Sequence, residues 1–144
     1  MESDAYWKNL IDRVYRQHEK LQGDEDLFYR LSCIYGETMV DGIESYFERR
    51  FDEYEMDMRA LTQCGFANIA ADFGEARNVM FGDAPLEESL VKRIIVELLD
   101  EDPTVSPTLN TLQVIYDRLV QTLEDLADYK CQFGLERGFY EESA

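Results

Sequence analysis

Hydrophobic residues recur along most of this chain in steps of three and four, which is the spacing of one face of an α-helix. The first stripe predicts a helix that runs to Gly23, and later stripes predict helices that end at Gly36, Gly65 and Gly82. The segment Asp83-Ala84-Pro85 predicts the start of another helix, because an N-cap Asp and a first-turn Pro both favour initiation. No segment alternates with the period of two that is typical of a strand. The pattern is therefore helical throughout.

The longest stripe lies toward the C terminus. Residues 100–107 hold two prolines and three consecutive acids, so we expect a loop there. Ser106 and Pro107 then predict the start of a long helix, which Gly134 and Gly138 end. Its apolar positions are Leu109, Leu112, Ile115, Tyr116, Leu119, Leu123, Leu126 and Phe133. With no internal repeat or linker-like stretch, the sequence predicts a single compact all-α domain over residues 1–144, with about six or seven helices and a long C-terminal helix.

The composition is strongly acidic. The chain has 14 Lys and Arg against 31 Asp and Glu, which leaves a formal charge of −17. A hydrophobic fraction of 45% with 12% aromatics excludes an acidic disordered tail, because such tails are poor in aromatics. So few basic residues also argue against direct binding to nucleic acid or to an anionic membrane surface. The charge therefore favours a basic partner protein, or it serves solubility alone.

The chain carries no targeting signal that we recognise. Its first residues lack the basic and apolar regions of a signal peptide, and no apolar run approaches the ~20 residues of a spanning helix. The three cysteines, Cys33, Cys64 and Cys131, are widely spaced and include no Cys-x-x-Cys pair. We therefore expect a cytoplasmic protein whose thiols are reduced and packed as small hydrophobic side chains.

Signals for catalysis or for a bound metal are weak. The chain has one histidine, His18, which we expect on the first helix, where a surface or boundary position is more typical than a catalytic one. There is no His-Glu-x-x-His or Glu-x-x-His motif, EF-hand, P-loop, dinucleotide-binding glycine pattern or nucleophile elbow. We therefore predict no catalytic residue, no metal and no cofactor, and an unrecognised enzyme is the least favoured alternative.

Acidic residues cluster at two places in the last third of the chain. On the long helix, Asp117, Glu124 and Asp128 are spaced by seven and four residues with Asp125 beside them, which predicts a negative ridge away from the apolar stripe. The second cluster, Asp100-Glu101-Asp102, lies in the preceding loop. Carboxylates three or four residues apart on a helix are about 5–6 Å apart, similar to neighbouring phosphates on one DNA strand. A folded helical surface can therefore imitate a row of phosphates.

A stretch in the first half of the chain carries a resemblance to a known family. Asp41-Gly42 is followed by Ile43 and by the pair Tyr46-Phe47, where the family has a Gly-Gly pair, an apolar residue and an aromatic pair. Ala60-Leu61 and the alanine-rich segment 67–76 continue the match. On these residues, segment 29–80 resembles a bacterial family of acidic helical proteins whose best-described member is a DNA mimic. The resemblance implies a helical fold and, for that member, binding to a DNA-binding protein in place of DNA.

Charge and resemblance together favour a DNA mimic. Such a protein would bind the DNA-binding face of a basic protein, such as a helix-turn-helix regulator, and would compete with DNA and so alter transcription regulation. An immunity-type inhibitor of a basic nuclease or toxin is the first alternative, and an acidic helical protein of another class is the second. The long amphipathic helix could also serve a homodimer, although a core within the chain is the commoner use. The predicted partner-binding residues are Asp100, Glu101, Asp102, Asp117, Glu124, Asp125 and Asp128.

Overall fold

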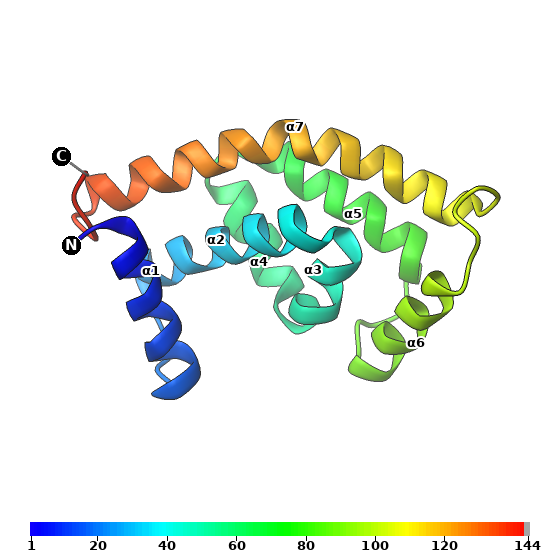
Figure 1. Cartoon of the computed structure of the whole chain (residues 1–144), viewed down its shortest axis with the longest axis horizontal. Helices are drawn as coiled ribbons and strands as arrows, with labels where there is room; N and C mark the ends of the chain where they lie inside the picture. Colours follow the sequence, from blue (N-terminus) through cyan, green and yellow to red (C-terminus); the bar gives the residue numbers. More distant parts are fainter. Residues whose placement is uncertain (143–144) are drawn as a thin grey trace.

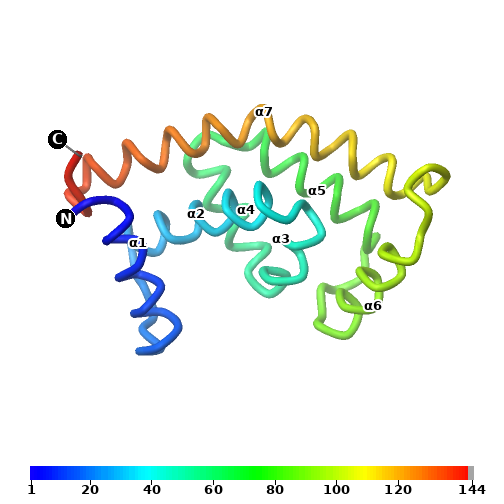
Figure 2. Tube along the Cα trace, viewed as in Figure 1, coloured from blue at the N-terminus to red at the C-terminus, as the bar shows by residue number. Residues whose placement is uncertain are grey.

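All regular structure in residues 1–142, the part of the chain that the computed structural model describes, is helical (Figure 1, Figure 2). This confirms the predicted all-α fold with a long C-terminal helix. A π-helical turn follows the first helix and a 3-10 turn precedes the fourth. In chain order the elements are α1 (Ser3–Ile11), η1 (Asp12–Arg16), α2 (Gly23–Asp41), α3 (Ile43–Arg50), η2 (Phe51–Glu53), α4 (Tyr54–Gln63), α5 (Ala67–Phe81), α6 (Glu88–Leu99) and α7 (Pro107–Glu136).

Helix α7 runs the length of the molecule, and the other helices lie on one side of it (Figure 1). Helices α2 and α5 make the most extensive contacts with it, while α3 and α4 pack against α2. Helix α6 packs against α3 and α5 near the end where α7 begins, and α1 lies at the other end. The two ends of α7 therefore lie near different helices of one elongated domain.

The main core is built from buried residues of α2 to α7, and α2 and α5 make its principal contacts with α7. The apolar stripe predicted on the C-terminal helix is one wall of it, and Ile115, Leu119, Leu123 and Leu126 have no exposed surface. Burying such a side chain stabilises the fold by about 1.5–3 kcal/mol relative to leaving it in water. The stripe that could have served a homodimer is thus used inside the chain.

A smaller aromatic cluster joins the two ends of the chain. Tyr6 of α1 lies 5.6 Å from Phe28 and 6.0 Å from Tyr140, measured between ring centroids. The backbone N–H of Glu141 donates to the carbonyl oxygen of Met1 at 2.8 Å. The N terminus and the end of the described chain therefore lie side by side, as Figure 1 shows.

Several predicted helix boundaries are confirmed. Gly65 and Gly82 follow α4 and α5 with positive φ angles of 89° and 61°, which glycine adopts without a steric clash. The Ser106 hydroxyl accepts a hydrogen bond from the backbone N–H of Leu109 at 3.2 Å, and Pro107 occupies the first turn of α7. The chemistry of caps and turns is local, so the sequence predicts these boundaries correctly.

Two other predicted helix ends are wrong. Helix α2 continues through Gly36 to Asp41, because a helical glycine costs only about 1 kcal/mol and the surrounding turns are anchored by buried residues such as Thr38. Gly23 begins α2 instead of ending the first helix. The chain reverses earlier, around His18, which has a φ of 53° and lies in an exposed turn outside any helix.

The segment Asp83-Ala84-Pro85 does not begin a helix, and α6 begins only at Glu88. The side chain of Arg77 donates to the carbonyl oxygen of Ala84 at 2.9 Å and to that of Gly82, which holds this segment in a non-helical connection. A long-range side-chain contact therefore overrides a favourable local pattern.

Gly134 also lies within a helix, where the sequence predicts an end. It is buried in α7 beneath the ring of Tyr140, and a Cβ atom at this position would overlap that ring. Gly138, with a φ of 73°, follows the last turn. Gly134 therefore permits close packing against Tyr140, and Gly138 follows the end of the helix.

Candidate functional site

The acidic ridge predicted on the C-terminal helix forms on α7. At 100° per residue, Asp117, Glu124 and Asp128 fall within a sector of about 40°, and Asp125 lies about 60° from Asp128. All four side chains are exposed, and the buried stripe occupies the opposite side of the helix. A rise of 1.5 Å per residue places Glu124 about 10 Å from Asp117 and about 6 Å from Asp128 along the axis. We call these four residues the α7 ridge.

Two carboxylates of the α7 ridge have polar neighbours. The side-chain amide of Gln113 donates to Asp117 at 2.9 Å. Burial raises the pKa of the Tyr35 hydroxyl on α2, and the negative charge of Glu124 raises it further. Neither neighbour brings a positive charge to the ridge.

The loop cluster Asp100-Glu101-Asp102 lies at the other end of the site, between α6 and α7. Asp102 accepts hydrogen bonds from the backbone N–H of Thr104 at 2.9 Å and from its hydroxyl at 2.8 Å, and these hold the pKa of Asp102 below its usual value. The Ser106 hydroxyl donates to the carboxylate of Glu101. All three acids are exposed, so polar contacts within the loop orient two of them without covering them.

Within residues 1–142, none of the seven predicted partner-binding carboxylates forms an ion pair. Of the two basic residues of α7, Arg118 pairs with Asp72 at 3.1 Å and with Glu75, both on α5, and Lys130 lies over the rings of Phe28 and Tyr35. Many other acids of the chain are paired with Arg or Lys. No basic side chain of residues 1–142 therefore neutralises the charge of these seven carboxylates in an ion pair.

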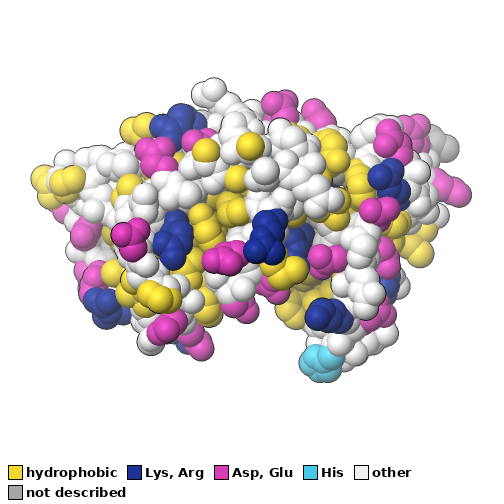
Figure 3. Space-filling model, turned by 180° about the vertical axis from the view of Figure 1, so that it is seen from behind, with side chains coloured by type: hydrophobic (Ala, Val, Ile, Leu, Met, Phe, Trp, Pro, Cys, Tyr) yellow, Lys and Arg dark blue, Asp and Glu magenta, His cyan; other side chains and the backbone are white. Residues whose placement is uncertain are grey.

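On the face that Figure 3 shows, the acids do not form one continuous field. Figure 3 shows the face opposite to that of Figure 1, where acidic and basic side chains are interspersed with hydrophobic patches. The two predicted clusters are also separate, because Asp117 lies about 15 Å along the helix axis from Pro107. The candidate surface therefore consists of two distinct clusters, the α7 ridge and the loop cluster.

The described residues contain no group of three or more His, Cys, Asp or Glu side chains arranged to hold a metal ion. His18 is exposed in the turn after η1, away from the helix on which we expected it. None of the helices in residues 1–142 is both long enough and apolar enough to cross a bilayer.

The three cysteines are free thiols in different environments. Cys33 and Cys64 are half-buried, and burial raises the pKa of the Cys33 thiol. Cys131 is exposed, so the prediction that it packs as a hydrophobic side chain is wrong. It lies about 40° from Asp117 around the α7 axis, which is the solvent side of the helix.

The sequence did not lead us to expect a buried ionic network where α2, α3 and α4 meet. The Asp57 side chain has no exposed surface. It accepts hydrogen bonds from Arg30 Nη1 at 3.0 Å, from Tyr46 Oη at 2.7 Å, and from both Nε and Nη2 of Arg50 at 2.8 Å. Glu53 adds a second carboxylate 2.9 Å from Arg30. One carboxylate therefore ties three helices together.

The charges in this network support one another. Burial disfavours the charge on Arg30, but hydrogen bonds to Glu53 and Asp57 outweigh burial, so the pKa of Arg30 is raised. Burial and then the charge of Asp57 raise the pKa of Tyr46 well above its usual value. A signal was present in the sequence, because Asp57 shares one face of α4 with Ala60, Leu61 and Cys64. An acid on an apolar face requires a buried partner.

Comparison of the chain with protein families, curated proteins and solved structures finds no match. Tyr46 and Phe47, the aromatic pair on which the family resemblance rests, are fully buried with ring centroids 5.2 Å apart. These residues serve the core, and the resemblance stays a prediction.

Proposed function

We propose that this protein is an acidic DNA mimic that binds the DNA-binding face of a basic protein, such as a helix-turn-helix regulator, and competes with DNA. The observation that carries the proposal is the α7 ridge, whose four exposed carboxylates form no ion pair within the described chain. A bare row of carboxylates on a rigid helix offers Lys and Arg the same anionic oxygens that a DNA strand offers.

The arrangement of the two acidic clusters supports this type of partner. Glu124 and Asp128 are separated by about 6 Å along the helix, so they present anionic oxygens in succession on one side of it, as the phosphates of a DNA strand do. The loop cluster adds a second negative region near the other end of α7. Proteins that read a DNA groove contact phosphates that flank it, so two separated acidic regions suit such a protein.

The net charge supports a long-range contribution to binding. A formal charge of −17 attracts a basic protein from beyond contact distance and raises the association rate. Added salt screens this attraction over a Debye length of about 8 Å at physiological ionic strength. Complex formation should therefore slow as salt is raised, mainly through the association rate.

The proposal is tested by capture and competition. The protein is immobilised and incubated at about 50 mM salt with proteins of the source organism that bind a heparin column. Double-stranded DNA is then used to elute the bound proteins. We expect DNA to release a basic DNA-binding protein, and the purified partner to lose DNA binding when this protein is added.

A matched pair of variants tests whether the α7 ridge makes the contact. The ridge variant carries Asp125→Lys and Asp128→Lys, and the control variant carries Asp52→Lys and Glu55→Lys, so the two change the net charge equally. The control acids are exposed on η2 and α4 and form no ion pair in the described chain. The ridge variant should slow association about tenfold or more, and the control much less.

Two results would contradict the proposal: no basic protein is retained at low salt, or the ridge and control variants have equal effects. If the captured protein is a nuclease or toxin whose activity falls, the immunity-type alternative is favoured.

A further inference from the structure

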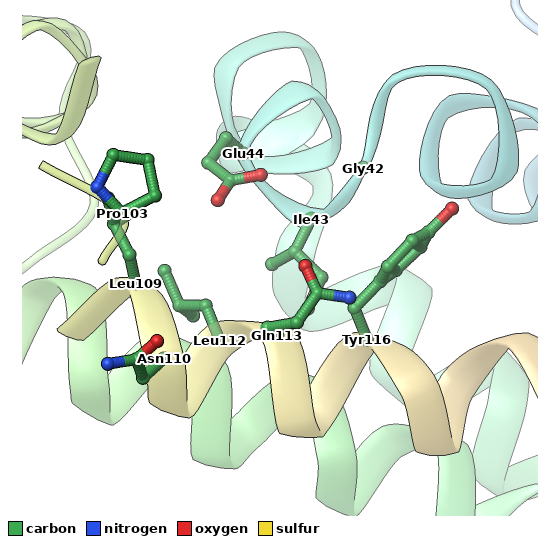
Figure 4. Close-up of a pocket in the computed structure, with 9 residues that line it drawn as sticks. All are labelled: Gly42, Ile43, Glu44, Pro103, Leu109, Asn110, Leu112, Gln113 and Tyr116. Carbon is green, nitrogen blue, oxygen red and sulfur yellow. The ribbon is translucent and has the colours of Figure 1, made fainter. Parts of the chain in front are cut away.

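Two adjoining hollows form a groove near the end of the molecule where α7 begins. One, of about 360 Å³, lies between the start of α3 and α7 (Figure 4). The other, of about 330 Å³, lies between α3 and α6. Both are lined by Glu44 and Leu109, so they are continuous. We call the two together the α3–α6 groove.

The floor of the α3–α6 groove is apolar and open to solvent. Ile95, Leu98, Leu99 and Leu109 line it, and Leu99 is 80% exposed. Ile95 and Leu98 are buried, so Leu99 is the strongly exposed apolar side chain of this lining. An exposed apolar side chain beside an open hollow offers a contact surface to an apolar group from outside. The floor is therefore suited to receive apolar side chains from outside.

The rim of the same groove is acidic. Asp41, Glu44 and Glu48 line it, and none of them forms an ion pair within residues 1–142. Figure 4 shows the Glu44 carboxylate pointing from α3 into the hollow, across from α7. Arg49 also lines the groove, but it pairs with Glu37 at 3.3 Å. The free charge on this rim is therefore negative.

The loop cluster adjoins the groove. Leu99 lines one hollow and Pro103 lines the other, and Asp100, Glu101 and Asp102 connect these two residues. The segment that carries these three exposed carboxylates therefore passes from one hollow to the other. The combination of apolar floor and acidic edge is what distinguishes this end of the molecule from the α7 ridge.

We infer that the α3–α6 groove binds a basic amphipathic helix of the partner protein. Apolar side chains at positions i, i+3 or i+4, and i+7 of that helix would fill the floor, and flanking Lys and Arg side chains would pair with the rim and the loop cluster. The inference rests on the proposed function, because both require a basic partner. A second copy of this chain is disfavoured as the occupant, since its charge of −17 would meet an acidic rim.

Peptide binding tests this inference directly. The probe is a fluorescently labelled peptide of about 16 residues made of Leu and Lys, with Leu at helical spacing. An isomer of the same composition, with Leu and Lys rearranged so that no helical stripe remains, measures attraction by charge alone. By fluorescence anisotropy at about 150 mM salt, the striped peptide should bind at least about tenfold more tightly than the isomer.

Variants locate the binding site. Leu99→Ser should weaken binding of the striped peptide about tenfold, whereas Val114→Ser, at a position 57% exposed on α7 outside the groove lining, should leave it unchanged. Glu44→Gln with Glu48→Gln should weaken binding at low salt more than at high salt. Circular dichroism confirms that each variant is folded.

The outcomes separate this inference from the proposed function. The groove inference is overturned if both peptides bind equally, or if Leu99→Ser and Val114→Ser have equal effects on peptide binding. If, in addition, the ridge variant (Asp125→Lys with Asp128→Lys) weakens the binding of both peptides, the DNA-mimic proposal stands while the groove inference fails. A dimer in sedimentation experiments that Leu99→Ser dissociates would show that a second copy occupies the groove, and would also overturn the inference.

Discussion

Replacing Asp57 by Asn should destabilise this protein by several kcal/mol. The change removes the one negative charge that lies between Arg30 and Arg50, and in either orientation of the amide its NH2 donor faces an N–H of Arg50. Arg30 keeps Glu53 as a partner, but the described structure shows no other ion pair for Arg50. Breaking a buried ion pair by removing one partner costs about 3–5 kcal/mol. Because the Arg50 side chain retains 12% exposure, we expect the lower end, about 3 kcal/mol.

This loss is large enough to measure in two ways. An unfolding entropy of about 2.1 cal/mol/K per residue gives about 0.3 kcal/mol/K for 144 residues, so Tm should fall by about 10 °C. Urea denaturation should show a lower midpoint with an unchanged slope. Asp52→Asn serves as the control, since this exposed acid forms no ion pair in the described chain and its loss should change stability by no more than about 0.5 kcal/mol.

A milder variant of the same network keeps the prediction testable if the first one does not fold. Tyr46→Phe removes a single hydrogen bond of 2.7 Å to the carboxylate and should destabilise by about 1.5–3 kcal/mol. If Asp57→Asn folds and loses less than about 1 kcal/mol, the charge of Asp57 does not hold the three helices together, and the reasoning is refuted.

Three further changes test other parts of the structure. Arg13 lies 2.8 Å from Glu25 and holds the pKa of that carboxyl below its usual value. The contribution of this ion pair to stability is therefore present above about pH 4.3 and is lost as pH falls through the folded pKa of Glu25. Glu25→Gln should flatten the loss of unfolding free energy between about pH 5 and pH 3 in urea titrations. Ser106→Ala should destabilise by about 1 kcal/mol in urea denaturation, because it removes the N-cap of the long helix. Gly134→Ala should displace the ring of Tyr140, because a Cβ atom there would overlap it, and should lower the pKa of the Tyr140 hydroxyl from about 12 toward 10. NMR of ¹³C-labelled tyrosine follows this titration. An unchanged titration would mean that the ring does not cover Gly134.

The parts of the structure that depend on local geometry could be predicted from the sequence. Apolar periodicity located the helices, and the fixed rotation per residue placed Asp117, Glu124 and Asp128 on one exposed side of α7. The Ser106 cap was predictable for the same reason. Gly36 and Gly134 do not end their helices, because a glycine ends a helix only where the chain turns, and tertiary packing decides where it turns.

Features that join distant segments could not be predicted. The partners of Asp57 lie on two other helices, α2 and α3, and its position among apolar residues signals only that partners must exist. The α3–α6 groove depends on how α6 is placed against α3, which no periodicity encodes. The separation between the loop cluster and the α7 ridge likewise follows from the length of α7 and from its neighbours.

Helix α7 both forms one wall of the core and carries the α7 ridge. Its inner face is packed through residues such as Leu119 and Leu123, which have no exposed surface, so its outer face cannot bend without disturbing close-packed side chains. The carboxylates are thus pre-organised, and association need not order the backbone beneath them. A partner would have to conform to a rigid row of carboxylates about 17 Å long, from Asp117 to Asp128. Selectivity among basic proteins would then arise from which of them can match that fixed spacing, and not from adaptation by this chain.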